Sequence, residues 1–227
     1  MSMFENYSEN FKTYKEQFGL FASLLSEYNK KYNLTSICDI KEVYIKHFLD
    51  SILPKDCFSD KASVIEIGSG GGFPSIPLKI VRKDLKFTLV ESTGKKCEFL
   101  KTAVDKLSLD CVQVLNIRAE DGAKDASLRE KFDFAVARAV ARLNTLCEYC
   151  LPYVKIGGKF LAYKGAFEEE LEEALNALEI LGGKVEKVYS YSLPEGCGER
   201  SVIVIKKVKK TPEKYPRGQG LERKKPL

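Results

Sequence analysis

A glycine-rich stretch follows a short apolar run at residues 63–67. Its glycines Gly68, Gly70 and Gly72 stand at alternate positions, and the acid Glu66 precedes the first of them by two residues. Glycine allows a positive φ and a close approach of the backbone to a ligand, and Pro74 suits the first turn of a helix. The Val- and Ile-rich run is typical of a buried strand. The pattern predicts a strand, loop and helix that bind a small molecule, although a tight turn with no ligand explains the same residues.

Two kinds of nucleotide ligand fit such a loop, and Phe73 separates them. A dinucleotide fingerprint has Gly or Ala three residues after its second glycine, whereas Phe73 stands three residues after Gly70. The E-x-G-x-G-x-G form instead resembles the first motif of Rossmann-like S-adenosylmethionine-dependent methyltransferases. A carboxylate such as Glu66 suits the positive sulfonium and ammonium groups of that ligand better than a pyrophosphate. The loop therefore favours S-adenosylmethionine over a nicotinamide cofactor.

A second strand-like run, at residues 86–91, ends in the acid Glu91. In nucleotide-binding folds a carboxylate about twenty residues beyond the glycine loop binds the ribose hydroxyls. We expect Glu91 to have this role. A solvated acid at a strand end, or one near the start of the next helix, is the alternative.

The bulk properties predict one main domain. The chain has 227 residues, of which 44% are hydrophobic, enough for one substantial core. No apolar run approaches the roughly eighteen residues of a membrane span. We expect a cytoplasmic protein with no membrane contact, and a monomer is the default expectation for its oligomeric state.

The seven cysteines do not form a disulfide framework, because their number is odd and they are scattered through a long chain. Cys147 and Cys150 are spaced C-x-x-C, but they lie in a run with helical apolar spacing and lack a second pair for zinc. Core packing explains them better, and no metal site is predicted.

Strands and helices alternate through most of the chain. Helical patterns at 8–32 and 39–52 predict an N-terminal helical cap spanning residues 1–60. Residues 61–208 predict an α/β domain with a mostly parallel, seven-stranded sheet that ends in an antiparallel hairpin, its strands near 63–67, 86–91, 111–116, 132–137, 158–163, 185–193 and 200–208. Helices are expected near 94–107, 142–151 and 167–181. Ligands of such sheets bind at the carboxyl ends of the strands.

The C-terminal end is basic. From Lys206 to Leu227 there are nine basic and two acidic residues, whereas the whole chain has a net charge of only +5. We treat residues 209–227 as a basic tail able to neutralise phosphates of a polyanion. A tail that only aids solubility is the alternative.

A set of short motifs covers nearly the whole chain in a fixed order: Tyr32-Asn33-Leu34-Thr35-Ser36, His47-Phe48-Leu49-Asp50-Ser51, Gly72-Phe73-Pro74-Ser75-Ile76-Pro77-Leu78, Arg118-Ala119-Glu120-Asp121, Ala137-Arg138-Ala139-Val140-Ala141, Leu151-Pro152, Lys164-Gly165 and Tyr215-Pro216-Arg217. In this order they resemble the bacterial ribosomal RNA small subunit methyltransferase G family, also called glucose-inhibited division protein B. The resemblance implies a Rossmann-like fold and methylation of a guanine N7 in the decoding-region loop of 16S ribosomal RNA, on the naked RNA, a precursor or the 30S subunit. Ile117, Ser75 and Glu222 depart from the common pattern without removing a proposed contact.

The resemblance also implies site residues. Its cofactor contacts fall on Gly68, Phe73, Ala119, Glu120 and Arg138. Ala119 and Glu120 follow the strand at 111–116, where they can meet the adenine, and Arg138 ends the next strand beside the methyl donor. An ion pair of Arg138 with Glu66 or Glu91 is the alternative or an added role.

Guanine N7 carries a lone pair and no hydrogen, so its methylation needs orientation and desolvation rather than a general base. Arg138 is therefore expected to position the reactants. His47, the only histidine, lies one helical turn from Asp50 and is expected to have a structural or RNA-positioning role rather than to transfer protons. Further predicted RNA contacts are Asn33, Lys164, Arg200 and Arg217. A non-catalytic RNA-binding or assembly factor that kept the fold is the competing hypothesis.

Overall fold

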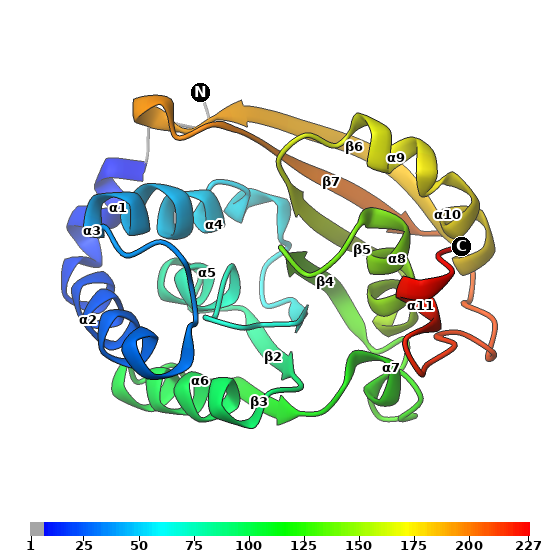
Figure 1. Ribbon diagram of the computed structural model, residues 1–227, viewed down its shortest axis with the longest axis horizontal. Coiled ribbons are helices and arrows are strands. Elements are labelled where there is room, and N and C mark those ends of the chain that lie inside the picture. Colours follow the sequence, from blue (N-terminus) through cyan, green and yellow to red (C-terminus); the bar gives the residue numbers. More distant parts are fainter. Residues whose placement is uncertain (1–6) are drawn as a thin grey trace.

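The computed structural model describes residues 7–227, which form a three-layer α/β structure around a seven-stranded sheet (Figure 1). The strands lie in the order β3-β2-β1-β4-β5-β7-β6. Their bounds are β1 Ser63–Ile67, β2 Lys86–Glu91, β3 Val112–Asn116, β4 Phe132–Arg138, β5 Val154–Lys164, β6 Gly183–Ser192 and β7 Glu199–Lys207. All pairs from β3 to β5 are parallel, and β7 runs antiparallel to both β5 and β6. The predicted fold, with its C-terminal antiparallel hairpin, is confirmed.

Each face of the sheet has its own apolar core. Val64 and Leu89 point into one core, whereas the neighbouring Ile65 and Val90 point into the other, as the alternation of a strand requires. All these residues are buried, so β1 and β2 are covered on both faces. Burial on both faces is the reason that the sequences of β1 and β2 are mostly apolar and do not alternate with polar residues.

Helices supply the two outer layers. Residues of α5 (Ser75–Val81) and α6 (Gly94–Lys106) enter the core that contains Val64, and residues of α8 (Leu143–Cys150) and α10 (Leu175–Leu181) enter the other. The shorter helices are η2 Lys55–Cys57, α7 Ala119–Gly122, η3 Leu151–Tyr153, α9 Glu168–Glu173, η4 Pro194–Gly196 and α11 Leu221–Lys224. The helix predicted over 167–181 is two helices, since it breaks at Ala174 between α9 and α10.

The N-terminal helices share the core of the sheet. The single helix predicted over 8–32 is two, α1 Tyr7–Thr13 and α2 Lys15–Tyr32, separated at Tyr14. Phe18 and Phe21 of α2 are fully buried in the same core as Val64. Residues 1–6 of the predicted 1–60 segment lie outside the described residues.

The helix expected over 39–52 contains an unusual turn. It runs as α3 Ile40–Glu42, a π-helix η1 Val43–Leu49 and α4 Asp50–Ile52. The Asp39 side chain starts it by accepting a hydrogen bond from the Glu42 backbone N–H at 2.9 Å. π-Helical turns are rare and often occur at functional sites, and this one contains His47.

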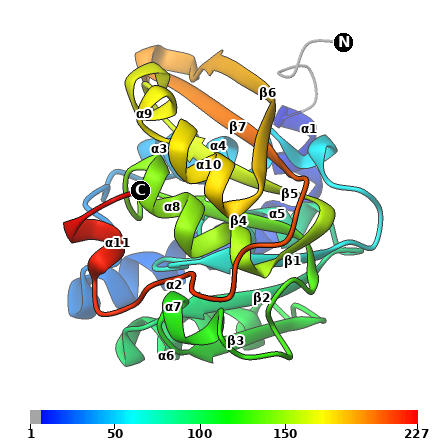
Figure 2. The ribbon, with the colours of Figure 1, turned by 90° about the vertical axis from the view of Figure 1, so that its right-hand side faces the viewer.

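The C-terminal segment, residues 209–227, packs on the body of the protein instead of projecting as a tail. It runs from the end of β7 past α7 to α11, which lies beside α8 (Figure 2). This segment has three buried side chains, Thr211, Tyr215 and Glu222. No helix within residues 7–227 is both long enough and apolar enough to cross a membrane.

Candidate active site

The glycine loop joins β1 to α5, and two of its glycines are sterically required. Gly68 has φ +71°, and a Cβ there would lie 2.7 Å from Cγ2 of Val140. Gly72 has φ +83°, and its Cβ would lie 2.6 Å from Cγ1 of Ile76. Since L-residues disfavour positive φ and such distances are clashes, a side chain at either position would force the loop apart.

Glu91 ties this loop to the end of β2. One carboxylate oxygen accepts a hydrogen bond from the Gly70 N–H at 3.0 Å and the other accepts one from the Thr93 N–H at 2.8 Å. The side chain is 6% exposed and lines the cleft above the loop. Each oxygen keeps a second lone pair, so the carboxylate can still accept hydrogen bonds from a ligand.

Two adjoining hollows lie over the carboxyl ends of β1, β2 and β4. The larger is a cleft of about 520 Å³ lined by the glycine loop, Glu91, Arg138 and Phe73. The smaller, about 180 Å³, is lined by Ile67, Ile117, Ala119, Glu120, Tyr149, Gly220 and Arg223, among others. Gly68, Ser92 and Val140 line both. A polar cleft that leads into a smaller, more apolar recess suits a ligand with a charged chain, a ribose and a purine ring.

Glu66 lies beneath the loop rather than in the cleft. Its side chain is fully buried, and neither carboxylate oxygen has a hydrogen-bond partner in the part of the chain that the structure describes. Burial raises the pKa of Glu66 to about 8, and the nearby Ser75 hydroxyl and Arg138 guanidinium oppose this only in part. A direct contact of Glu66 with a cofactor stays a prediction.

Phe73 connects the loop to two polar side chains. The His47 ring stacks on it with centroids 4.4 Å apart, and the Arg138 guanidinium lies 5.0 Å from its centroid. Arg138 also donates a hydrogen bond to Asp50 at 2.9 Å. The alternative ion-pair partners expected for Arg138, Glu66 and Glu91, are therefore wrong, since Asp50 holds the guanidinium in this structure.

His47 is fixed on both ring nitrogens. Nδ1 lies 3.0 Å from Nη2 of Arg138, and Nε2 lies 2.7 Å from the Thr35 hydroxyl. Because Arg138 can only donate, Nδ1 accepts and Nε2 carries the proton. Burial and the Arg138 charge lower the pKa of His47 to about 3. A neutral, pinned imidazole fits a positioning role and is unsuited to proton transfer near neutral pH.

A third hollow, about 300 Å³, opens beside the first, with Ile37, His47, Arg138 and Ala139 lining both. Its walls bring together four residues that the sequence analysis singled out: His47, Arg138, Lys164 and Arg200. Lys46 lines it too. The concentration of cationic side chains around one hollow suits a phosphate-bearing ligand.

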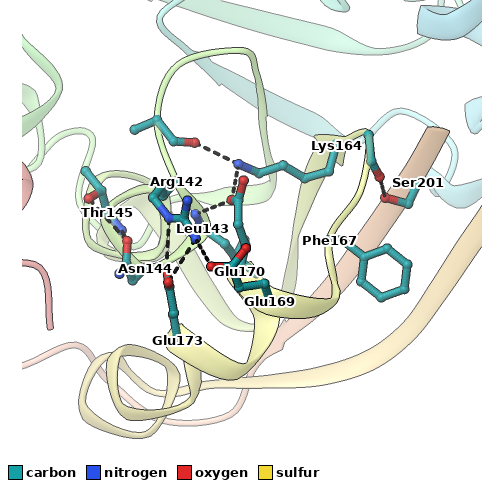
Figure 3. Close-up of polar contacts among 12 residues, drawn as sticks. Arg142, Leu143, Asn144, Thr145, Lys164, Phe167, Glu169, Glu170, Glu173 and Ser201 are labelled. Carbon is teal, nitrogen blue, oxygen red and sulfur yellow. Dashed lines mark hydrogen bonds and ion pairs between the residues drawn. The ribbon is translucent and has the colours of Figure 1, made fainter. Parts of the chain in front are cut away.

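The Lys164 ammonium is already paired within the protein (Figure 3). It donates to a Glu170 carboxylate oxygen at 2.6 Å and to the Ala141 carbonyl at 2.7 Å. The side chain is 10% exposed. These bonds fasten the end of β5 to α9, so Lys164 shapes the wall of the third hollow before any ligand binds.

The other two predicted RNA residues lie elsewhere. Asn33 ends α2 in a left-handed conformation and lines a groove between α2 and the helix that follows, which shares Thr35 and Ile37 with the large cleft. Arg217 forms an ion pair with Glu148 at 2.7 Å, on the C-terminal segment. Their RNA contacts stay predictions, and the structure does not bring them to the third hollow.

Cys147 and Cys150 are fully buried in α8, and both thiols are free. Burial raises the pKa of each well above its usual range. Among residues 7–227 no group of three or more His, Cys, Asp or Glu side chains is arranged to hold a metal ion. The cysteine pair is part of the apolar core.

Sequence reasoning missed several residues of the site. Asp50 is nearly buried and contacts Arg138 and the Tyr191 hydroxyl, the latter at 3.0 Å. Gly220 and Arg223 line the smaller hollow from the C-terminal segment. A buried acid one helical turn from the only histidine was a usable signal for Asp50, whereas nothing local marked Arg223.

The strand order and a glycine-loop cleft at the carboxyl ends of the strands define a Rossmann-like methyltransferase. Solved structures with this fold include a SAM-dependent methyltransferase from Aquifex aeolicus, 19% identical, with TM-score 0.55 over 80% of this chain and 97% of that one. M. jannaschii TYW2, solved in complex with AdoMet, is 16% identical with TM-score 0.53 over 69% of this chain and 74% of that one.

The sequence comparisons give the family. Residues 14–202 match the model of the rRNA small subunit methyltransferase G family, and the chain belongs to that family. Relatives with the name ribosomal RNA small subunit methyltransferase G include those of Brevibacillus brevis, 50% identical over 94% of this chain and 91% of its own, and Lactobacillus johnsonii, 48% identical with the same coverage. The predicted family is confirmed.

Proposed function

We propose that this protein transfers the methyl group of S-adenosylmethionine to N7 of a guanine in the decoding-region loop of small-subunit ribosomal RNA. The observation that carries the proposal is the series of three hollows along the carboxyl edge of the sheet. A purine recess, a polar cleft and a basic opening follow one another in the order that the adenosine, the methionine and an RNA base require.

The residues present fit the cofactor. The recess between Ile67, Ile117 and Val140 would take the adenine, with Ala119 and Glu120 at its edge. The Glu91 carboxylate would accept hydrogen bonds from the ribose hydroxyls, and the loop would lie against the methionine part. When bound, S-adenosylmethionine supplies an electrophilic methyl group on a positive sulfur.

The chain's own part in the reaction is to hold the target base and exclude water. N7 has a free lone pair, so no proton leaves it during methyl transfer. The neutral His47 and the paired Arg138 line both the cleft and the basic opening. We therefore assign them to orientation of the purine, and orientation with desolvation is the main source of rate for such a transfer.

The RNA backbone would meet the cationic wall of the third hollow. Arg200 is partly exposed there, 3.9 Å from Asp50, and Lys46 pairs with Glu42 at the same opening. We propose a monomer as the active unit. Binding that depends on such side chains weakens steeply as salt rises.

The test is methyl transfer in vitro. Purified protein with labelled S-adenosylmethionine and undermethylated small-subunit RNA, naked or in subunits, should place label on one guanine, and Arg138→Ala should lose most of the rate. RNA binding with neither cofactor affinity by calorimetry nor label transfer would instead support a non-catalytic assembly factor.

A further inference from the structure

The outer wall of the purine recess comes from the end of the chain. Gly220 and Arg223 line the recess together with Ala119 and Glu120. The family model ends at residue 202, so this wall lies outside the part of the chain that the model matches. An arginine at the rim of a purine-sized recess can stack its planar guanidinium on an aromatic ring and donate hydrogen bonds to its edge.

We propose that the C-terminal segment, residues 209–227, completes the cofactor site, and that Arg223 binds the adenosine half of the cofactor. The identity of the ligand rests on the proposed function, whereas the contribution of the C-terminal segment to the wall of the recess is observed in the structure. In this assignment the basic segment contributes to cofactor binding, and only its other exposed basic side chains can bind RNA.

The segment is fastened close to the recess. Arg223 donates to the carbonyl of Val140 at 3.0 Å, and Val140 is the residue whose side chain stands against Gly68. The Thr145 hydroxyl donates to the Glu222 carbonyl at 2.8 Å. The Glu222 side chain is fully buried and accepts a short hydrogen bond from the Gly218 N–H. Arg223 is therefore held at the rim by its own bond to Val140 and by the contacts of Glu222, the residue before it.

A buried ion pair fixes the start of this turn. The Glu148 carboxylate on α8 is fully buried and accepts hydrogen bonds from the Arg217 side chain and backbone, at 2.7 Å for Nη2 and 2.8 Å for the N–H. Further back, Arg129 donates to the carbonyls of Thr211 and Tyr215 at 3.0 and 2.9 Å. A segment bound at so many buried points is a fixed wall of the recess.

The chain offers a matched control for Arg223. Lys224 is its neighbour, is exposed, carries the same charge and does not line the recess. Arg223→Ala and Lys224→Ala thus remove equal charge from adjacent positions of one helix, and only the first removes a group from the recess.

The experiment is calorimetric titration of the full-length chain with S-adenosylmethionine and with 5′-methylthioadenosine, without RNA. Arg223→Ala should raise the Kd for both ligands by the same factor, about 5- to 20-fold, which is roughly 1–2 kcal/mol. Lys224→Ala should stay within about twofold of the unchanged protein, and Arg223→Lys should be intermediate because it keeps the charge but loses the plane.

Thermal unfolding shows whether a weaker Kd comes from the loss of the Arg223 side chain or from unfolding of the protein. Arg223→Ala and Lys224→Ala should have nearly equal Tm values. Equal Kd values for these two variants and the unchanged protein would overturn the inference. If the unchanged protein bound neither ligand, the proposed cofactor would fail, and the role of Arg223 with it.

Discussion

Arg138 at the end of β4 and Asp50 at the start of α4 form an ion pair of 2.9 Å in which the side chains are 13% and 4% exposed. Asp50 also accepts a hydrogen bond from Tyr191 and lies 3.9 Å from Arg200. One nearly buried carboxylate therefore sets the place of two arginines that face the proposed site of the RNA base.

Asp50→Ala should destabilise the protein strongly, because it leaves the largely buried Arg138 charge without its carboxylate partner. We expect a loss of about 3–5 kcal/mol in the free energy of unfolding, measured by denaturant titration. Glu42→Ala is the control, since it breaks the half-exposed ion pair to Lys46, and it should cost under about 1 kcal/mol. Equal losses in the two variants would contradict the role given to Asp50.

Asp50→Asn keeps the shape and removes the charge. Because we propose that Arg138 orients the target base, the methylation rate should fall by about tenfold or more, while the Kd for S-adenosylmethionine should change little. Single-turnover methylation and calorimetry measure the two quantities. A raised Kd for S-adenosylmethionine with an unchanged methylation rate would indicate that Arg138 contacts the cofactor rather than the base.

His47 should remain neutral far below its usual pKa, because burial and Arg138 lower that pKa to about 3. It is the only histidine, so its imidazole signal in an NMR titration can be assigned without ambiguity. The signal should keep its neutral position down to about pH 4. A midpoint near 6.5 would contradict the buried contact with Arg138.

The same shift predicts how stability responds to acid. Between about pH 6.5 and 3 the unfolded chain binds a proton at His47 that the folded chain does not, so the free energy of unfolding falls as pH falls. The slope from one proton is at most about 1.4 kcal/mol per pH unit. His47→Asn should flatten the stability curve in this range, as followed by urea unfolding at several pH values.

Glu66 has the opposite dependence. Its folded pKa is raised to about 8 from 4.5, so the folded chain holds a proton that the unfolded chain releases in that interval, and stability falls as pH rises. Glu66→Gln keeps a neutral side chain at every pH. Its stability relative to the unchanged protein should grow from pH 5 to pH 8; a difference that stays constant would mean that Glu66 is not protonated in the fold.

Gly68→Ala should damage the loop, since the new methyl would meet Val140 at 2.7 Å and the backbone has φ +71°. We expect at least about 1 kcal/mol of lost stability and at least tenfold weaker cofactor binding. Val140→Ala added to it should recover part of the loss by removing the clash. Gly19→Ala is the control: nothing lies within 4 Å of its added Cβ on α2, and it should stabilise the protein by roughly 0.5–1 kcal/mol.

The fold could be predicted because its signals are local. The strand that contains Glu66, the glycines after it and the alternation of strands with helices each lie within a few residues of sequence. The loop glycines were recognised for the same reason, since positive φ and close packing select glycine directly. Cys147 and Cys150 were placed in the core from apolar spacing alone.

The contacts that complete the site could not be predicted, because they join distant residues. Asp50 and Arg138 lie 88 residues apart in the chain, and Arg217 meets Glu148 across 69 residues. The charge of the C-terminal segment suggested a free basic tail, but charge alone does not reveal the buried acids Glu148 and Glu222 that bind the segment to α8 and to itself. The π-helical turn at His47 likewise depends on packing rather than on local propensity.

The most direct measurement is mass spectrometry of small-subunit ribosomal RNA from cells that lack this protein. The RNA should lack one methyl group, at N7 of a single guanine in the decoding-region loop, and the unchanged protein but not Arg138→Ala should restore it. RNA that keeps every methyl group in those cells would contradict the account.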